Sequence, residues 1–181
     1  MKRSWLLIYK VLSFFFPEER GCRFRNALLR RAGAVIGKHV TISPRAIIEG
    51  TGKLIIEDEV FIGPGTQITA NGTSTVHIKK NTQIAHFVSI KTTTHCINST
   101  IFKDGVGYTG GGGIMGRCQF LDITIEEGCW ICAGVIILPG VTVHQYSVCA
   151  AGTVVTHDVP PCSLVAGVPG VIKKTYPVEI K

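Results

Sequence analysis

Proton transfer near neutral pH is the chemistry that the histidines of this chain could perform, because an imidazole titrates closest to that range. The sequence offers His39, His77, His86, His95, His144 and His157. His95 has the most informative position, since it ends the run KTTTH, which begins at Lys91, directly before a glycine-rich stretch. On the residues alone, a general base and an ordinary surface histidine are both open at this position.

Apolar residues at intervals of six must position any such site. They recur in four blocks: Ile36, Ile42, Ile48; Ile56, Ile62, Ile68; Ile78, Ile84, Ile90; and Ile125, Ile131, Ile137, Val143, Cys149, Val155. A period of six fits neither the 3.6-residue period of a helix nor the plain alternation of a long strand. The pattern therefore predicts a solenoid in which short strands repeat side by side.

The breaks in this period predict insertions at the corners of the solenoid, where loops leave without disturbing the stacked core. The step to the next anchor grows to eight residues after Ile48, to ten after Ile68 and to thirty-five after Ile90. The longest insertion, residues 96–122, is rich in glycine and is expected to be a mobile loop. Long loops in compact domains are usually functional or disordered, so a role in the site and a plain surface excursion both stay open.

Composition limits the chain to one domain, since 181 residues with 45% hydrophobic content suffice for a single substantial core. We predict a basic, apolar N-terminal helical segment over 1–33, a β-helix over 34–172 and a C-terminal tail over 173–181. The seven cysteines are an odd number, and three of them fall on repeat positions that need small or apolar side chains. They are better explained as core thiols than as a disulfide scaffold. The CxxC pair at Cys129 and Cys132 lacks a second pair or a histidine at zinc spacing, so no metal is expected.

Positive charge is concentrated at the N-terminus. Through Arg31 the chain carries eight Lys or Arg against two Glu, and this difference of six is most of the formal +7. The repeat body is nearly neutral, so nucleic acid is not an expected partner. The apolar run from Trp5 to Phe16 is well short of the roughly twenty residues that span a bilayer, and no small-residue cleavage site of a signal peptide follows it. This run and the basic helical pattern over 22–32 either contact an anionic membrane surface or cap the open end of the solenoid, and the two roles are compatible.

The C-terminal coils resemble the hexapeptide-repeat acyltransferases. The resemblance covers about residues 34–174 and is carried by the runs WICAG (130–134), ILPGV (137–141), AAGTVVTHDVPPCS (150–163) and AGVPGVIK (166–173). It implies a left-handed parallel β-helix of triangular section, in which three hexapeptides make one coil, and a homotrimer with active sites in the clefts between subunits. Residues eighteen apart would then lie one coil apart, separated by roughly the 4.8 Å between neighbouring strands.

The resemblance also gives His95 a role, because KTTTH is similar to the family's Thr-x-Thr-His segment, whose histidine is the general base. Since His77 and His95 are eighteen apart, we expect them to stack on one corner, where like charges would keep His95 neutral. This position makes His77 a substrate-binding candidate, together with Trp130 and Arg117. Trp130 matches a tryptophan that lines the cleft, with simple packing as the alternative. Arg117, on the long loop, is a candidate for holding an acidic or phosphorylated acceptor. The segment 63–65, with Gly63 and Gly65, stands where some sugar acetyltransferases have an asparagine, so backbone N–H groups would have to support the oxyanion.

The donor that the resemblance implies is acetyl-CoA. Small residues on the C-terminal coils would let the pantetheine arm run close to the backbone, and basic residues beyond them would meet the phosphates. The cofactor-binding candidates are Ala133, Ala151, Gly152, Thr156, His157, Lys173 and Lys174. His157 stands where the family commonly has lysine, and Val171 where a second arginine can occur, so phosphate binding would depend more on the two lysines.

Taken together, these features favour O-acetylation of a sugar in a cell-surface polysaccharide or its lipid-linked precursor. The protein would act in the cytoplasm, and peripheral association with the inner face of the membrane is compatible with this location. A serine or antibiotic acetyltransferase and a noncatalytic β-helix scaffold stay open as alternatives. A carbonic-anhydrase-like metalloenzyme does not fit, because histidines nine residues apart face different sides of the solenoid and cannot converge within one coil.

Overall fold

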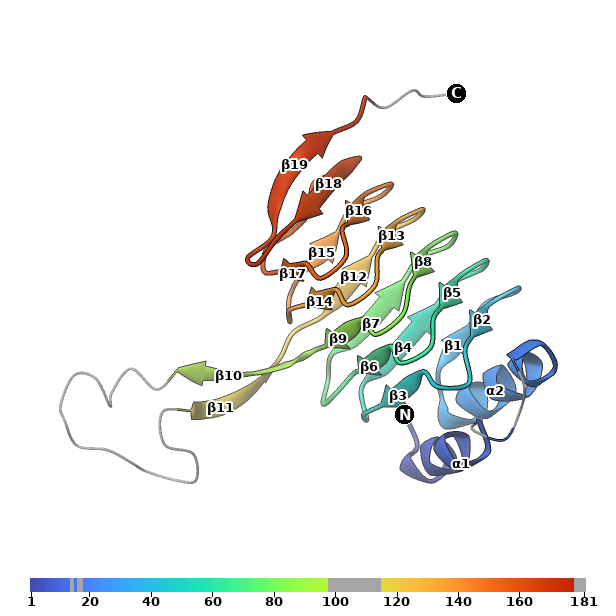
Figure 1. The fold of residues 1–181 in the computed structure, drawn as a ribbon. Helices are drawn as coiled ribbons and strands as arrows, with labels where there is room; N and C mark the ends of the chain where they lie inside the picture. The colour runs from blue at the N-terminus through green and yellow to red at the C-terminus, as the bar shows by residue number, and fades with distance from the viewer. Residues whose placement is uncertain (14, 16–17, 98–114, 178–181) are drawn as a thin grey trace.

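The computed structural model describes residues 1–13, 15, 18–97 and 115–177; the side chains of 18–20, 96, 97 and 115–117 lie outside the description. Its body is a parallel β-solenoid whose strands form three sheets (Figure 1). The first sheet contains β1 (Val35–Ile36), β4 (Lys53–Ile56), β7 (Thr75–Ile78), β12 (Ile123–Ile125) and β15 (Thr142–Val143). The second contains β2 (Thr41–Ile42), β5 (Phe61–Ile62), β8 (Gln83–Ile84), β13 (Trp130–Ile131), β16 (Val148–Cys149), β18 (Ser163–Ala166) and β19 (Val171–Thr175). The third contains β3 (Ile47–Glu49), β6 (Gln67–Thr69), β9 (Ser89–Lys91), β14 (Ile136–Ile137) and β17 (Val154–Val155).

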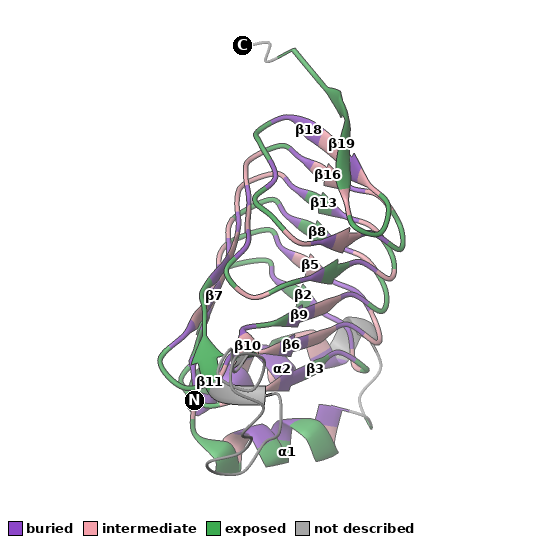
Figure 2. Ribbon diagram, turned by 90° about the vertical axis from the view of Figure 1, so that its left-hand side faces the viewer, coloured by how far each residue is buried: buried purple, intermediate pink, exposed green. Residues whose placement is uncertain are grey.

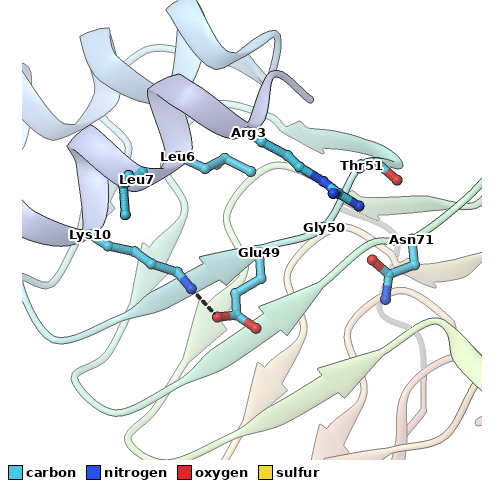
Figure 3. Close-up of a pocket in the computed structure, with 8 residues that line it drawn as sticks. All are labelled: Arg3, Leu6, Leu7, Lys10, Glu49, Gly50, Thr51 and Asn71. Atoms are coloured by element: carbon cyan, nitrogen blue, oxygen red, sulfur yellow. Dashed lines mark hydrogen bonds and ion pairs between the residues drawn. The ribbon is translucent and has the colours of Figure 1, made fainter.

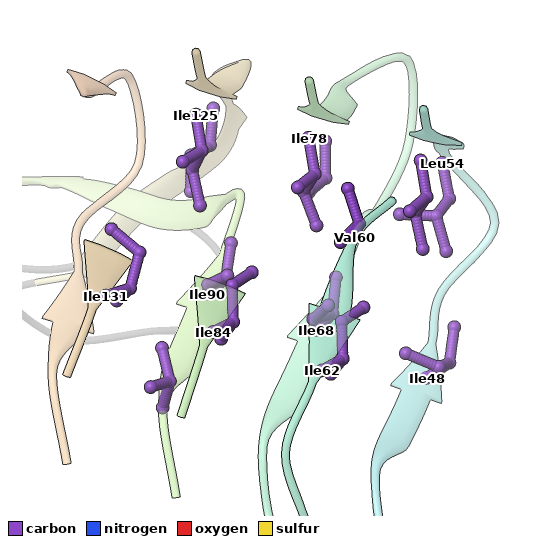
Figure 4. Packing of buried hydrophobic residues seen from close by; sticks show 14 of the residues in the cluster. Ile48, Leu54, Val60, Ile62, Ile68, Ile78, Ile84, Ile90, Ile125 and Ile131 are labelled. Carbon is purple, nitrogen blue, oxygen red and sulfur yellow. The ribbon is translucent and has the colours of Figure 1, made fainter. Parts of the chain in front are cut away.

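The six-residue anchors form the core of the solenoid, as the period predicts. Each anchor lies beside the equivalent anchor of the next coil, as in the ladder Ile62, Ile84, Ile131 and Cys149. Figure 4 shows the first three of these side chains. All four side chains are fully buried. Burying an aliphatic side chain of this size contributes about 1.5–3 kcal/mol, so the stacked ladders are the main source of stability. Along the strands, buried residues alternate with partly or fully exposed ones (Figure 2).

The corners of the solenoid require a backbone conformation that few residues adopt easily. The third residue after an anchor has positive φ in ten of the fifteen hexapeptides. Half of these residues are glycine, namely Gly65, Gly128, Gly134, Gly140 and Gly152, and the others are His39, Glu59, Asn81, Phe87 and Tyr146. Side chains with a Cβ are strained in this region, which explains why glycine recurs in the repeat.

Two helices cover the first coil: α1 (Arg3–Ser13) and α2 (Glu18–Ala32). Their polar side chains donate hydrogen bonds to backbone carbonyls of that coil. Arg25 Nε bonds the carbonyl of Ile42 at 2.8 Å, and Asn26 Nδ2 bonds that of Val40 at 2.8 Å. The Tyr9 hydroxyl bonds the carbonyl of Ala46 at 3.0 Å. The helices therefore cap the open end of the solenoid, which is one of the two roles that the sequence left open.

Two segments differ from the sequence expectation. Part of the expected loop 96–122 is an antiparallel hairpin of β10 (Thr93–Ile97) and β11 (Met115–Phe120); most of its glycines lie in 98–114, outside the described residues. The expected tail from residue 173 begins inside β19, which pairs antiparallel with β18. In both places the strand forms by pairing with a neighbour, and the six-residue period gives no signal for such pairing.

Candidate active site

His95 lies on the hairpin, which extends away from the solenoid (Figure 1). Its register partner across the hairpin is Cys118, and the Cys118 Sγ lies 3.7 Å from Nδ1 and 3.8 Å from Nε2 of the imidazole. Both side chains are exposed. Because side chains alternate along a strand and opposite residues share a face, one face of the hairpin carries Thr93 and His95 together with their partners Phe120 and Cys118.

Hydrogen bonds hold the base of the hairpin against the coil below it. Asn71 Nδ2 donates to Thr93 Oγ1 at 3.0 Å, and the Asn71 backbone N–H donates to Thr92 Oγ1 at 3.1 Å. Ser74 Oγ donates to the same Thr92 hydroxyl at 2.6 Å. The Phe120 ring covers Gly72, where an added Cβ would come within 2.7 Å of the ring. The hairpin therefore leaves the solenoid in a direction fixed by the corner at residues 71–74.

His77 does not stack with His95, so that sequence prediction is wrong. His77 lies on β7 in the first sheet, with Ile55 and Thr124 as its register neighbours. Its Nε2 lies 2.7 Å from Glu57 Oε1. The eighteen-residue spacing places residues one coil apart only while both belong to the solenoid, and His95 lies on the hairpin strand β10, which leaves the solenoid after β9. A substrate-binding role for His77 stays a prediction.

The cofactor-binding candidates occupy two corners and one sheet. Ala133 and Ala151 with Gly134 and Gly152 stack on the corner between the second and third sheets, which we call the glycine corner. The Gly152 N–H donates to the Ala133 carbonyl at 2.9 Å, and a Cβ added to Gly134 would lie 3.9 Å from Gly152 Cα. Ala133, Ala151 and Gly152 are exposed. These small residues leave the backbone open to an extended thioester arm, so the residues present fit the donor.

The hairpin emerges from the corner between the third and first sheets, which we call the hairpin corner. Thr156 and His157 lie on the same corner two coils further on, and Thr156 Oγ1 is 2.9 Å from His157 Nδ1. Trp130 lies on the second sheet, where its side chain is 55% exposed.

Lys173 and Lys174 lie on β19, and Lys174 Nζ is 4.8 Å from the centre of the Tyr176 ring. Arg117 lies on β11, but its side chain is outside the description. One chain therefore holds the candidates on separate surfaces and does not gather them in one pocket. Asn71 and Cys118, which touch the His95 strand or the imidazole itself, were missed by sequence reasoning. The enlarged step after Ile68 is the only sequence signal for Asn71.

The buried thiols have no reactive character. Burial raises the pKa of Cys129 to about 11 and that of Cys149 to about 12, and it also raises the pKa of Cys132. Such thiols stay protonated and poorly nucleophilic at neutral pH. Among the described residues, no three His, Cys, Asp or Glu side chains are grouped so that they could hold a metal ion.

An ion-pair cluster ties neighbouring coils together away from the hairpin. Glu126 accepts from Lys79 at 2.8 Å and lies 3.1 Å from His144 Nδ1. The hydrogen bond from Lys79 holds the pKa of Glu126 below its ordinary value, and the same contact raises the pKa of Lys79. The cluster is explained by coil packing.

No helix in the described part of the chain has the length and apolar character needed to cross a bilayer.

Known proteins are similar to this chain in sequence and in fold, although no family model matches it. A galactoside O-acetyltransferase of Escherichia coli is 30% identical over 80% of this chain and 65% of its own length. A putative colanic acid biosynthesis acetyltransferase of the same organism is 29% identical over 83% of this chain and 74% of its own length. The chain thus spans about 65% of the length of the galactoside O-acetyltransferases that it matches.

Solved structures match most of the chain. A hexapeptide-repeat acetyltransferase of Vibrio cholerae in complex with acetyl coenzyme A has a TM-score of 0.60 and 25% identity, over 96% of this chain and 86% of that one. A maltose O-acetyltransferase of Clostridium difficile has a TM-score of 0.63 and 23% identity, over 98% of this chain and 87% of that one. This second match supports the fold alone. In its six-residue repeat, its β-solenoid fold and these relatives, the chain is similar to the hexapeptide-repeat acetyltransferases.

Proposed function

We propose that the protein transfers an acetyl group from acetyl-CoA to a hydroxyl of a sugar in a cell-surface polysaccharide or its precursor, with His95 as general base. The observation that carries this proposal is the position of His95 on a rigidly based hairpin, at the corner that also bears Thr156 and His157. The donor is supported by the exposed small residues of the glycine corner. The class of acceptor is supported by relatives named for galactoside and colanic acid acetylation.

The proposed reaction needs only proton transfer by the protein and no covalent enzyme intermediate. The imidazole of His95 takes the proton of the acceptor hydroxyl while that oxygen attacks the thioester carbonyl carbon. Backbone N–H groups stabilise the oxyanion of the tetrahedral intermediate. The carbon–sulfur bond then breaks, and the imidazolium returns its proton to the departing thiolate. The products are the acetyl ester and free coenzyme A.

A homotrimer is part of this proposal. The hairpin corner and the glycine corner are different edges of one prism, so a single chain places the base and the thioester groove apart. Three prisms packed side by side would set the hairpin corner of one subunit against the glycine corner of the next. The extension of the hairpin beyond its own solenoid supports this arrangement (Figure 1).

Contact with a membrane surface is a further part. Leu7 and Val11 are four residues apart on α1, on one face of the helix, and are 64% and 53% exposed. Lys2 and Arg3 begin the same segment. An apolar stripe with flanking cations fits an anionic bilayer, where a lipid-linked acceptor on the cytoplasmic face would be found. We expect the protein to cosediment with anionic but not with neutral vesicles, and a Val11→Glu variant to lose this binding. Equal sedimentation with both kinds of vesicle would exclude this contact.

The test of the reaction is thiol release from acetyl-CoA with sugars, free serine and chloramphenicol as acceptors. His95→Ala is expected to lower turnover by about 10² to 10⁴ with unchanged affinity for acetyl-CoA. His39→Asn is the matched control, because His39 is an exposed histidine at a corner of the first coil and asparagine tolerates its positive φ of 52°. Full activity of His95→Ala with every acceptor would refute the assigned base. Absence of thiol release with every acceptor would favour the scaffold alternative.

A further inference from the structure

The hairpin corner carries a cavity of about 360 Å³ at the end of the molecule that the helices cap. It lies between α1 and the corner segments of the first two coils (Figure 3). Its lining combines an apolar wall with several polar groups: Arg3, Leu6, Leu7, Lys10, Glu49, Gly50, Thr51 and Asn71. A concave site of this size with a few convergent polar groups is typical of a small-molecule subsite.

The charge of this cavity comes from Arg3. Lys10 is paired with Glu49, so these two charges offset one another (Figure 3). The guanidinium of Arg3 points along the cavity toward Thr51 and Asn71 (Figure 3). Within the described residues it has no ion pair. An unpaired guanidinium beside a hydroxyl and an amide suits a ligand that has both an anionic group and several hydroxyls, because arginine binds carboxylate and phosphate oxygens in a bidentate manner.

The cavity is connected to the strand of His95 through one side chain. Asn71 lines the cavity and donates from Nδ2 to Thr93 Oγ1 at 3.0 Å. Thr93 and His95 project from the same face of β10, and residues two apart on a strand are separated by roughly 7 Å. A saccharide seated against Arg3 and Asn71 would therefore extend along this face toward the imidazole.

We infer that this cavity binds an anionic sugar residue of the acceptor, next to the residue that receives the acetyl group, and that Arg3 selects it. The inference rests on the proposed function and names its substrate class as an acidic glycan. Leu6 and Leu7 provide the apolar wall for the C–H face of the ring, and Thr51 and Asn71 provide hydrogen bonds for its hydroxyls. A uronic acid and a sugar phosphate share the required chemistry, since each presents anionic oxygens to the guanidinium.

The experiment compares three oligosaccharide acceptors of equal length: one with a hexuronate, one with the same carboxyl reduced to an alcohol, and one with a sugar phosphate. Arg3→Gln is expected to lower kcat/KM by about 10- to 100-fold for an anionic acceptor and to leave the neutral acceptor unchanged. Arg3→Lys should retain part of the preference, because lysine keeps the charge but not the fork. The control is Lys38→Gln, which removes an exposed cation of the first coil that does not line the cavity.

Binding without acetyl-CoA separates this inference from the proposed reaction. Titration of the full chain with the hexuronate and phosphate oligosaccharides should give Kd values that rise at least tenfold in Arg3→Gln and not in Lys38→Gln. A larger loss of affinity for one of the two anionic oligosaccharides identifies whether the site prefers a carboxylate or a phosphate. If wild type and Arg3→Gln bind and acetylate acidic and neutral acceptors equally, the inference is overturned. If binding depends on Arg3 but no acceptor releases coenzyme A, the subsite stands and the proposed reaction falls.

Discussion

Tyr9 links the capping helix α1 to the first coil, and its removal tests how the cap is held. Its ring is fully buried, and its hydroxyl donates to the Ala46 carbonyl at 3.0 Å. Tyr9→Phe keeps the ring and deletes this hydrogen bond. A net hydrogen bond contributes about 0.5–1.5 kcal/mol, so at pH 8 the variant should unfold with a free energy lower by about 1 kcal/mol.

The sign of this difference should change at alkaline pH. Burial raises the pKa of the Tyr9 hydroxyl above its ordinary value of 10.0, although the positive charge of Arg25 opposes the shift. Above pH 10 the unfolded chain therefore loses a proton that the folded chain retains. The stability from Tyr9 is fully present below the unfolded pKa and falls by about 1.4 kcal/mol per pH unit above it. The Tyr9→Phe variant does not lose stability in this way, so the unfolding free energies of the two proteins should become equal at about pH 11.

Urea unfolding of both proteins at several pH values between 8 and 11, followed by circular dichroism, measures this crossing. The buried thiols also lower the unfolding free energy at alkaline pH. Their contribution is the same in both proteins and cancels in the difference. Tyr146→Phe is the control, because the Tyr146 ring is 54% exposed and should give a constant, near-zero difference. A Tyr9→Phe difference that stays constant across the range would refute the reasoning, since it would mean that the hydroxyl is not desolvated in the fold.

Three other results are expected. Ile84→Ala should lower the unfolding free energy by about 2–5 kcal/mol in urea titrations, because it opens a cavity inside a fully buried ladder. Iodoacetamide should label exposed Cys118 in the native protein and spare Cys149, whose pKa of about 12 suppresses the thiolate; equal labelling by mass spectrometry would contradict the buried position. Glu126→Gln should cost stability at pH 7 and nothing at low pH, because the stability from Glu126, with its pKa lowered by Lys79, is present above the unfolded pKa and is lost as pH falls through the folded pKa. Thermal melts across pH 2–7 would show a pH-independent difference if the contact with Lys79 were unimportant.

The solenoid could be predicted from the sequence because each hexapeptide contributes one short strand and one turn. Anchors such as Ile62 and Ile84 contact each other because they occupy equivalent positions in successive coils. The local six-residue period therefore already predicts these long-range contacts. The contacts of the capping helices could not be predicted in this way. The chain predicts two basic, apolar helices, but not that Arg25 and Asn26 lie among edge carbonyls, because those partners are set by how α2 docks on the first coil.

The site could be predicted only in part. The resemblance singled out His95 and the glycine corner, but not the neighbours of the imidazole. The pairing of His95 with Cys118 depends on the register of a hairpin whose connection lies outside any repeat. The stacking of His77 on His95 was wrong because the count of eighteen treats His95 as part of the regular coil, whereas it lies on the hairpin. A period predicts neighbours only along the uninterrupted part of the repeat.

The interruptions of the repeat all fall on the edge of the solenoid where we propose that the acceptor binds. The enlarged steps follow Ile48, Ile68 and Ile90, each of which is the third anchor of its coil. With three hexapeptides per coil, every third step falls on the same corner, so all three insertions accumulate on one edge of the prism. The first two supply Thr51 and Asn71 to the cavity, and the third supplies the hairpin with His95. The regular positions build the scaffold, and successive departures at a single corner build the surface on which we place the acceptor.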